Sequence, residues 1–164
     1  MLITLSAALL IFLDQLSKFA ANRWLAPVDS AQFIPGIINL FYTENTGASF
    51  SMLEGFRWGF VVLTVVVAAV LLRILFHPRH PAIGATRAAI VMILAGAVGN
   101  GIDRALCGRV VDMFQFDFIN FPVFNVADIY INIGIAWLVL LVVLGKSTGL
   151  GFDKTKAADY RNPL

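Results

Sequence analysis

Four long runs of apolar residues divide the chain, at roughly residues 2–21, 59–76, 83–102 and 126–144. Each is close to the ~20 residues that an α-helix needs to cross the hydrocarbon core of a bilayer. Between the first two runs lies an insert, residues 27–56. Its stretch INLFYTEN is rich in β-branched and aromatic residues and lies between Pro-Gly and Thr-Gly turn signals. The pattern predicts an all-α membrane protein with a small β element, built as one domain over residues 1–164 without internal repeats.

The first apolar run has a second possible interpretation. Small residues, FAAN, follow it, as they do at the end of a cleavable signal peptide. However, no Lys or Arg precedes the run, and Asp14 interrupts its end. We therefore expect a retained transmembrane helix.

The composition supports a membrane protein. Hydrophobic residues make up 59% of the 164 residues and charged residues only 13%, with a mean hydropathy of +0.84. A water-soluble domain carries far more charge. The insert and its flank are rich in aromatic side chains that typically rest at the headgroup region: Phe33, Phe41, Tyr42, Phe50, Phe56 and Trp58. They predict a small sheet lying on the bilayer surface, with a plain aromatic anchor as the alternative.

The charges predict an orientation. The loop between the second and third runs is basic and holds Arg73, His77, Arg79, His80 and Arg87, and the C-terminal tail holds Lys146, Lys154, Lys156 and Arg161. Basic residues near the ends of spans tend to stay in the cytoplasm. The other two loops contain the acids Asp29, Glu44, Glu54, Asp112 and Asp117. Both termini are therefore predicted to be cytoplasmic, and the net charge of +2 reflects this sidedness rather than binding to nucleic acid.

This topology gathers scattered acids. Asp103 ends the third run, Asp128 begins the fourth, and Asp112 lies in the outer loop that joins them. Asp14 reaches the same level, because the first helix climbs ~1.5 Å per residue from the cytoplasmic side. Acids at membrane depth are often functional, although structural pairing is the alternative.

The residue types around this cluster restrict its chemistry. Cys107 lies on the outer side and both histidines on the inner side, so neither a thiol nor a serine has a histidine base nearby. The zinc motif HExxH is absent, and we expect neither a metal ion nor another cofactor. Two carboxylates that share one proton remain plausible, one as base and one as acid.

Five short motifs then carry a resemblance: LDQLSK from Leu13, NTGASFS from Asn45, GNGIDR from Gly99, GRVVD from Gly108 and FNVAD from Phe124. In this order and spacing they resemble lipoprotein signal peptidase, the bacterial signal peptidase II family. The similarity covers nearly the whole chain. It implies four transmembrane helices, an outward-facing β-cradle and a mobile loop before the last helix.

The resemblance also implies a function. A protein of this family is an aspartic endopeptidase of the bacterial inner membrane, which cleaves prolipoproteins immediately before a diacylglyceryl-modified cysteine. By motif position, Asp112 and Asp128 would be the catalytic dyad. The polar surround of the dyad would comprise Asp14, Asn45, Asn100, Asp103, Arg104 and Asn125. The expected partners are diacylglyceryl-modified prolipoproteins and membrane lipids, and we expect a monomer with its active site near the outer face.

Physical roles can be assigned to some of these side chains as hypotheses. The amides of Asn45 and Asn125 can hold a carboxylate or the substrate backbone. Arg104 is predicted to pair with Asp103 or Asp14. Asn132 is predicted to form an interhelical hydrogen bond.

Two further groups complete these hypotheses. Gly99, Gly101 and Gly108 would permit close backbone approach and a turn after the third run. Phenylalanines near the outer loop are interfacial anchors or apolar contacts for substrate lipid: Phe114, Phe116, Phe118 and Phe121.

Two other functions remain open from the residues alone. Intramembrane acids also mark the ion paths of proton- or cation-coupled transporters. Such proteins favour acids spread across the bilayer and repeated halves, and neither is found in this sequence. A non-enzymatic membrane assembly factor is the third possibility, in which the acids only bind partners.

Overall fold

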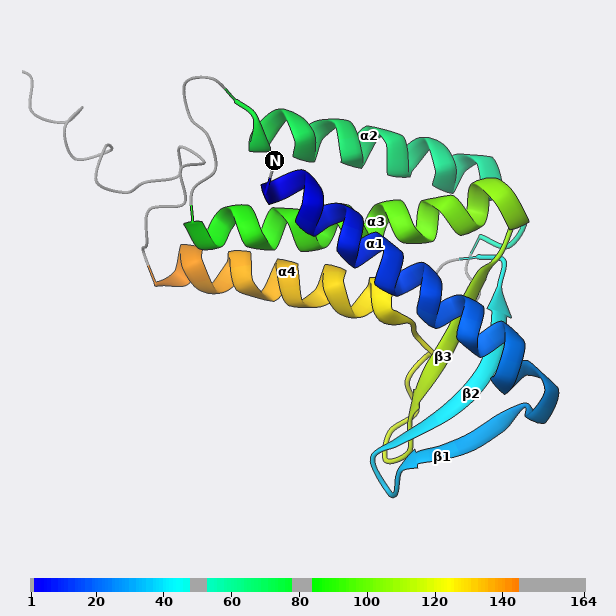
Figure 1. Cartoon of the computed structure of the whole chain (residues 1–164). Helices are drawn as coiled ribbons and strands as arrows, with labels where there is room; N and C mark the ends of the chain where they lie inside the picture. The colour runs from blue at the N-terminus through cyan, green and yellow to red at the C-terminus, as the bar shows by residue number, and fades with distance from the viewer. Residues whose placement is uncertain (1, 48–52, 78–83, 145–164) are drawn as a thin grey trace, which may run out of the picture.

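The computed structural model describes residues 2–47, 53–77 and 84–144. Within these residues four α-helices form a bundle: α1 (Leu2–Ala20), α2 (Arg57–Leu75), α3 (Gly84–Cys107) and α4 (Val126–Val143). A sheet of three strands lies at one end of the bundle (Figure 1): β1 (Ser30–Ile34), β2 (Ile38–Asn45) and β3 (Val110–Phe116). The predicted fold class, mostly helical with a small β element, is confirmed.

Each helix is long and apolar enough to cross a bilayer. Helix α1 continues beyond Ala20 through a π-helical turn (Ala21–Leu25) and a 3-10 turn (Ala26–Val28), so its span reaches further than the predicted residues 2–21. Most of the large side chains that α1, α2 and α4 expose are apolar, among them Leu9, Phe12, Val62, Val66, Val139 and Leu140. Faces of this kind are stable against lipid tails and not against water.

Helix α3 is the centre of the bundle and packs against α1, α2 and α4. Figure 1 shows it running between α2 and α4, with α1 crossing in front. Small residues allow this close packing. A Cβ added at Gly99 would collide with the Asp14 carboxylate, and one at Gly101 would collide with the side chain of Thr64. The predicted close approach at these two glycines is confirmed.

The turn after α3 also requires glycine. Helix α3 ends at Cys107, five residues later than the predicted end at 102, and Gly108 follows with φ +75°. A side chain disfavours this left-handed conformation, as predicted for Gly108. The turn leads directly into β3.

The sheet is antiparallel in the order β1-β2-β3. Strand β2 coincides with the predicted stretch INLFYTEN. Strand β3 was not predicted: Asp112 lies within this strand, opposite Thr43 of β2, and not in an irregular loop. Its sequence VVDMFQF alternates weakly, and it becomes a strand because β2 offers an edge for pairing. Met113 of β3 packs with Ala21 and Leu25 of the π-helical turn that follows α1, and this contact joins the sheet to the bundle.

Several predictions concern residues that the structure does not describe. Arg79 and His80 of the basic loop lie outside the described residues. So do the tail residues Lys146, Lys154, Lys156 and Arg161, and residues 48–51 of the NTGASFS motif.

Candidate active site

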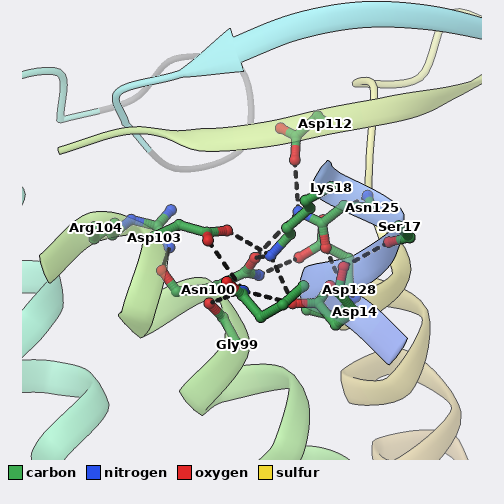
Figure 2. A network of polar contacts seen from close by, with 12 residues as sticks. Asp14, Ser17, Lys18, Gly99, Asn100, Asp103, Arg104, Asp112, Asn125 and Asp128 are labelled. Carbon is green, nitrogen blue, oxygen red and sulfur yellow. Dashed lines mark hydrogen bonds and ion pairs between the residues drawn. The ribbon is translucent and has the colours of Figure 1, made fainter. Parts of the chain in front are cut away.

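Polar side chains from distant parts of the sequence meet where the helix bundle joins the sheet (Figure 2). They come from α1, α3, β2, β3 and the start of α4. The network comprises Asp14, Lys18, Asn45, Asn100, Asp103, Arg104, Asp112, Asn125 and Asp128. All eight site residues predicted from the sequence lie here, and Lys18 is the addition.

The start of α4 fixes the position of Asp128. Asn125 is the N-cap residue, and its side-chain oxygen accepts a hydrogen bond of 3.0 Å from the Asp128 backbone N–H. In return, Asp128 Oδ2 accepts one of 3.1 Å from the Asn125 backbone N–H. This capping box satisfies two backbone donors that a helix start otherwise leaves unpaired. The sequence FNVAD therefore positions the Asp128 carboxylate by forming the helix.

The same Asn125 reaches the second carboxylate. Its side-chain N–H group donates a hydrogen bond of 2.6 Å to Asp112 Oδ1, and Asn45 of β2 donates one of 3.1 Å to Asp112 Oδ2. Asn125 is fully buried and Asp112 is 3% exposed. The buried Asn125 side chain thus connects the Asp112 carboxyl group to the helix cap that holds Asp128.

The surroundings favour a proton on Asp112. Burial is the largest cause, and the nearby negative charge of Asp128 acts in the same direction; together they raise the pKa of Asp112 to about 6. The hydrogen bonds from Asn45 and Asn125 and the positive charge of Lys18 oppose this rise and do not cancel it. A carboxyl group with a raised pKa beside an ionised one is the arrangement that acid–base catalysis uses.

The other oxygen of Asp128 faces α3. Asp128 Oδ1 accepts a hydrogen bond of 2.8 Å from the side-chain amide of Asn100. The oxygen of that amide accepts two bonds, of 2.9 Å from Lys18 Nζ and of 3.1 Å from Asn125 Nδ2. Both oxygens of Asp128 therefore have defined donors.

Lys18 is the residue of this network that the sequence reasoning missed. Its ammonium group lies 2.8 Å from Asp14 Oδ2 and 2.6 Å from Asp103 Oδ2, and the residue is only 4% exposed. A buried cation is stable only when it is paired, and here two carboxylates surround it. The signal was present in LDQLSK, because residues four apart on a helix face the same side.

Asp14 ties the helices together. Its second oxygen, Oδ1, accepts a hydrogen bond of 2.9 Å from the Ala127 backbone N–H in the first turn of α4. Gln15 adds bonds of 3.2 Å to the Gly99 carbonyl and 3.0 Å to Asp103 Oδ1. A carboxylate at a helix N-terminus is favoured by the free backbone donors there. Asp14 thus contacts Lys18 and the start of α4 and does not reach either proposed catalytic carboxylate directly.

The prediction that Arg104 pairs with Asp103 or Asp14 is wrong, because Lys18 forms both ion pairs. Arg104 instead donates a hydrogen bond of 2.8 Å to the Gly47 carbonyl, just after β2, and its guanidinium group lies 4.8 Å from the centre of the Phe60 ring. The Gly47 backbone N–H donates to Asn45 Oδ1 at 2.9 Å. Arg104 therefore supports the segment that carries Asn45.

The prediction of an interhelical bond from Asn132 is also wrong. Asn132 Nδ2 donates a bond of 2.9 Å to the Asp128 carbonyl within α4 itself. Its side chain lines an apolar cavity of about 260 Å³ together with Phe116, Phe121 and Phe124. Of the four phenylalanines named from the sequence, Phe116 and Phe121 thus line a cavity beside the first turns of α4.

A second cavity, of about 220 Å³, lies beside Asp112. It is bounded by Asn45 and neighbouring residues of β2 on one side and by residues 120–123 on the other. The volume is several times that of a water molecule, about 30 Å³ in the liquid. The cavity therefore has room for water beside Asp112.

Within the described residues, Cys107 and His77 are not part of this network. Cys107 is exposed at the end of α3. His77 follows α2, whose C-terminal end lies at the end of the bundle opposite to the sheet (Figure 1). Among the described residues, no three His, Cys, Asp or Glu side chains are grouped as metal ligands. Asp112 and Asp128 are the two carboxyl groups that the Asn125 side chain and helix cap connect.

Known proteins resemble this chain over most of its length. Residues 6–144 match the family described as signal peptidase (SPase) II. A lipoprotein signal peptidase from Streptococcus pyogenes serotype M1 is 41% identical over 151 residues, which cover 92% of this chain and 97% of that protein. The lipoprotein signal peptidase of S. pyogenes serotype M5 (strain Manfredo) is 42% identical over 140 residues, or 85% of this chain and 91% of that protein.

Solved structures resemble the fold as well. Two bacterial membrane enzyme structures, determined by the in meso method at 2.3 Å and 1.9 Å resolution, match with TM-scores of 0.77 and 0.76. Their sequence identities are 29% and 30%, and the matches cover 86% and 85% of this chain and 87% and 91% of theirs. With the family match over residues 6–144, these similarities lead to one conclusion: the chain belongs to the signal peptidase II family.

Proposed function

We propose that this chain is an aspartic endopeptidase of the bacterial inner membrane, with Asp112 and Asp128 as its catalytic dyad. Its substrates are prolipoproteins, and it cleaves the bond immediately before their diacylglyceryl-modified cysteine. Family membership supports removal of signal peptides from prolipoproteins. The observation that carries the aspartic mechanism is the Asn125 side chain, which bonds Asp112 directly and caps the helix turn that holds Asp128.

The reaction follows from one proton shared between the two carboxyl groups. Asp128, as the carboxylate, takes a proton from water, whose oxygen attacks the scissile carbonyl carbon. Asp112, as the acid, donates a hydrogen bond to the carbonyl oxygen and then its proton as negative charge develops there. When the C–N bond breaks, Asp128 transfers its proton to the leaving amine, which becomes the new N-terminus of the lipoprotein. The product carboxylic acid forms as its hydroxyl proton returns to Asp112.

The supporting residues divide into two groups in this proposal. Asn45, Asn100 and Asn125 hold the carboxylates of the dyad by direct hydrogen bonds. Asp14, Asp103 and Arg104 act one step further away, on Lys18 and on the segment after β2.

The setting in the membrane is part of the proposal. A cytoplasmic location of both termini would put the sheet and the dyad at the outer face, where water is present and the lipid of the substrate can stay in the bilayer. The basic loop and tail support this orientation. The chain would act as a monomer, since the described residues supply both carboxylates and their donors.

The experiment compares two forms of one precursor peptide, with and without the diacylglyceryl group on its cysteine. Purified protein in lipid nanodiscs is expected to cleave the lipidated form, with mass spectrometry locating the cut directly before the cysteine. The unmodified form should be cleaved much more slowly, because nothing holds its cysteine at headgroup depth. Equal cleavage of both forms, or a cut elsewhere, would contradict the substrate assignment. If neither form were cleaved, the transporter and assembly-factor functions would again be open.

A further inference from the structure

Lys18 lies at the centre of the polar network but touches neither proposed catalytic carboxylate. We infer that Lys18 is a positioning residue for the dyad: its ammonium group sets the orientation of the Asn100 amide and thereby presents an N–H donor to Asp128. This inference rests on the proposed function of Asp128, and it assigns a role to a residue that the family motifs alone leave without one.

The geometry of Asn100 carries the inference. A carboxamide has an oxygen that accepts and a nitrogen that donates, and turning it over exchanges the two. Lys18 has only donors, and it lies 2.9 Å from Asn100 Oδ1. The amide nitrogen is then directed at Asp128 Oδ1, 2.8 Å away. With the amide reversed, two donors would face each other at Lys18 and two oxygens would face each other at Asp128.

The placement of Lys18 holds the Asn100 amide firmly in this orientation. Asp14 and Asp103 hold its ammonium group from two helices, at 2.8 Å and 2.6 Å, and the residue is 4% exposed. The Nζ atom therefore has little freedom to leave Asn100. Asn125 also donates to Asn100 Oδ1, at the longer distance of 3.1 Å, so it supports the same orientation from α4.

The charge of Lys18 also reaches the dyad. Lys18 lowers the pKa of Asp112, against the larger rise caused by burial and by Asp128. The charged groups around Asp112 are Asp128 of α4, Lys18 of α1 and Arg104 of α3. Replacement of Lys18 by a neutral residue should therefore raise the pKa of Asp112 further. This is an effect of the Lys18 charge, separate from its hydrogen bond to Asn100, and it gives a second readout.

Lys18→Met tests both effects, with Arg23→Met as the matched control. Arg23 is exposed in the turn that continues α1, so its replacement removes the same charge outside the network. For Lys18→Met, kcat with the lipidated precursor should fall about tenfold or more, while KM changes little. The reason is that Asn100 is no longer held in the orientation that donates a hydrogen bond to the charged Asp128. Activity falls at high pH when Asp112 loses its proton, and this limb of the pH profile should move to higher pH. Arg23→Met should match the unmodified protein in both respects.

A second variant guards against misfolding. Lys18→Met leaves Asp14 and Asp103 unpaired, whereas Lys18→Met/Asp103→Asn restores the net charge of this triad. It still lacks the donor to Asn100, so kcat should remain low in a protein that folds. Carbon-13 NMR of the aspartate carboxyl groups gives a readout without activity: Asp112 should titrate at higher pH in Lys18→Met. A folded Lys18 variant with unchanged kcat, pH limb and Asp112 titration would overturn the inference, even if the substrate assignment held.

Discussion

Asp112 is deeply buried and has a charged neighbour, and these two causes of its raised pKa can be separated. Burial is the larger cause of its raised pKa of about 6, and the charge of Asp128 is the second. In Asp128→Asn the second cause disappears and the first remains. The pKa of Asp112 should therefore fall below about 6. Carbon-13 NMR titration of the aspartate carboxyl groups measures this directly.

The sign of the change makes this prediction specific. Loss of the Asp128 charge lowers the pKa of Asp112, whereas loss of the Lys18 charge raises it, although both substitutions neutralise a nearby charge. If Asp112 titrated at an unchanged pH in Asp128→Asn, the two carboxyl groups would not be electrostatically coupled. The shared-proton mechanism would then lose its basis.

The acids of the site and the amides that hold Asp112 could be predicted from the sequence, but the cation that pairs with Asp14 and Asp103 could not. A polar residue in an apolar run is conspicuous, and the order of spans puts Asp14 and Asp103 at the same level. Which cation meets them depends on the rotation of α1 and α3 about their axes. Lys18 is close in sequence to Asp14, and Arg104 follows Asp103 directly. Only the packing shows that Lys18 forms the ion pairs, while Arg104 turns toward Gly47.

At the scale of elements, the Asn125 side chain at the start of α4 has two functions that substitutions can separate. Its side-chain oxygen caps the helix, and its nitrogen binds Asp112. Asn125→Ser retains a capping oxygen but loses the donor to Asp112, and Asn125→Ala loses both. We expect the Ala variant to be about 1 kcal/mol less stable than the Ser variant, as is typical for loss of an N-cap.

Activity should respond differently from stability. Both Asn125 variants should cleave the lipidated precursor about tenfold or more slowly, because both lack the hydrogen bond to Asp112. Denaturant unfolding in detergent and initial rates measure the two effects on the same preparations. A Ser variant with near-native activity would show that the contact with Asp112 is dispensable. Equal stability of the two variants would argue against a role of the cap.

The elements differ in how far the sequence predicts them. The helices follow from apolar length alone, and β2 follows from a local run between turn signals. Strand β3 has a weaker pattern, since Asp112 and Gln115 interrupt its apolar residues, and its structure depends on pairing with β2 from a distant part of the chain. This pairing places Asp112 opposite Thr43, a position that no local rule predicts.

At the scale of the whole molecule, the orientation in the membrane determines where the site meets its substrate. Single cysteines in a Cys107→Ser background can report it. Positions 79 and 147 should react only with reagents that reach the cytoplasm. Positions 32 and 117, at the sheet and just after β3, should react from the outside with a membrane-impermeant maleimide. The inverse pattern would put the dyad at the cytoplasmic face and contradict the proposed route of the substrate.

The central claim is that Asp112 and Asp128 act as one catalytic unit. The most direct measurement is the cleavage rate of the lipidated precursor by Asp112→Asn, Asp128→Asn and the double variant, with Cys107→Ser as a control that should stay near-native. Asn keeps the shape of the side chain but cannot exchange the proton. Each single variant should lose activity by about a thousandfold or more while it still folds, and the double variant should be little worse, as residues of one unit behave. A folded single variant that retained a substantial part of the native rate would contradict the aspartic dyad.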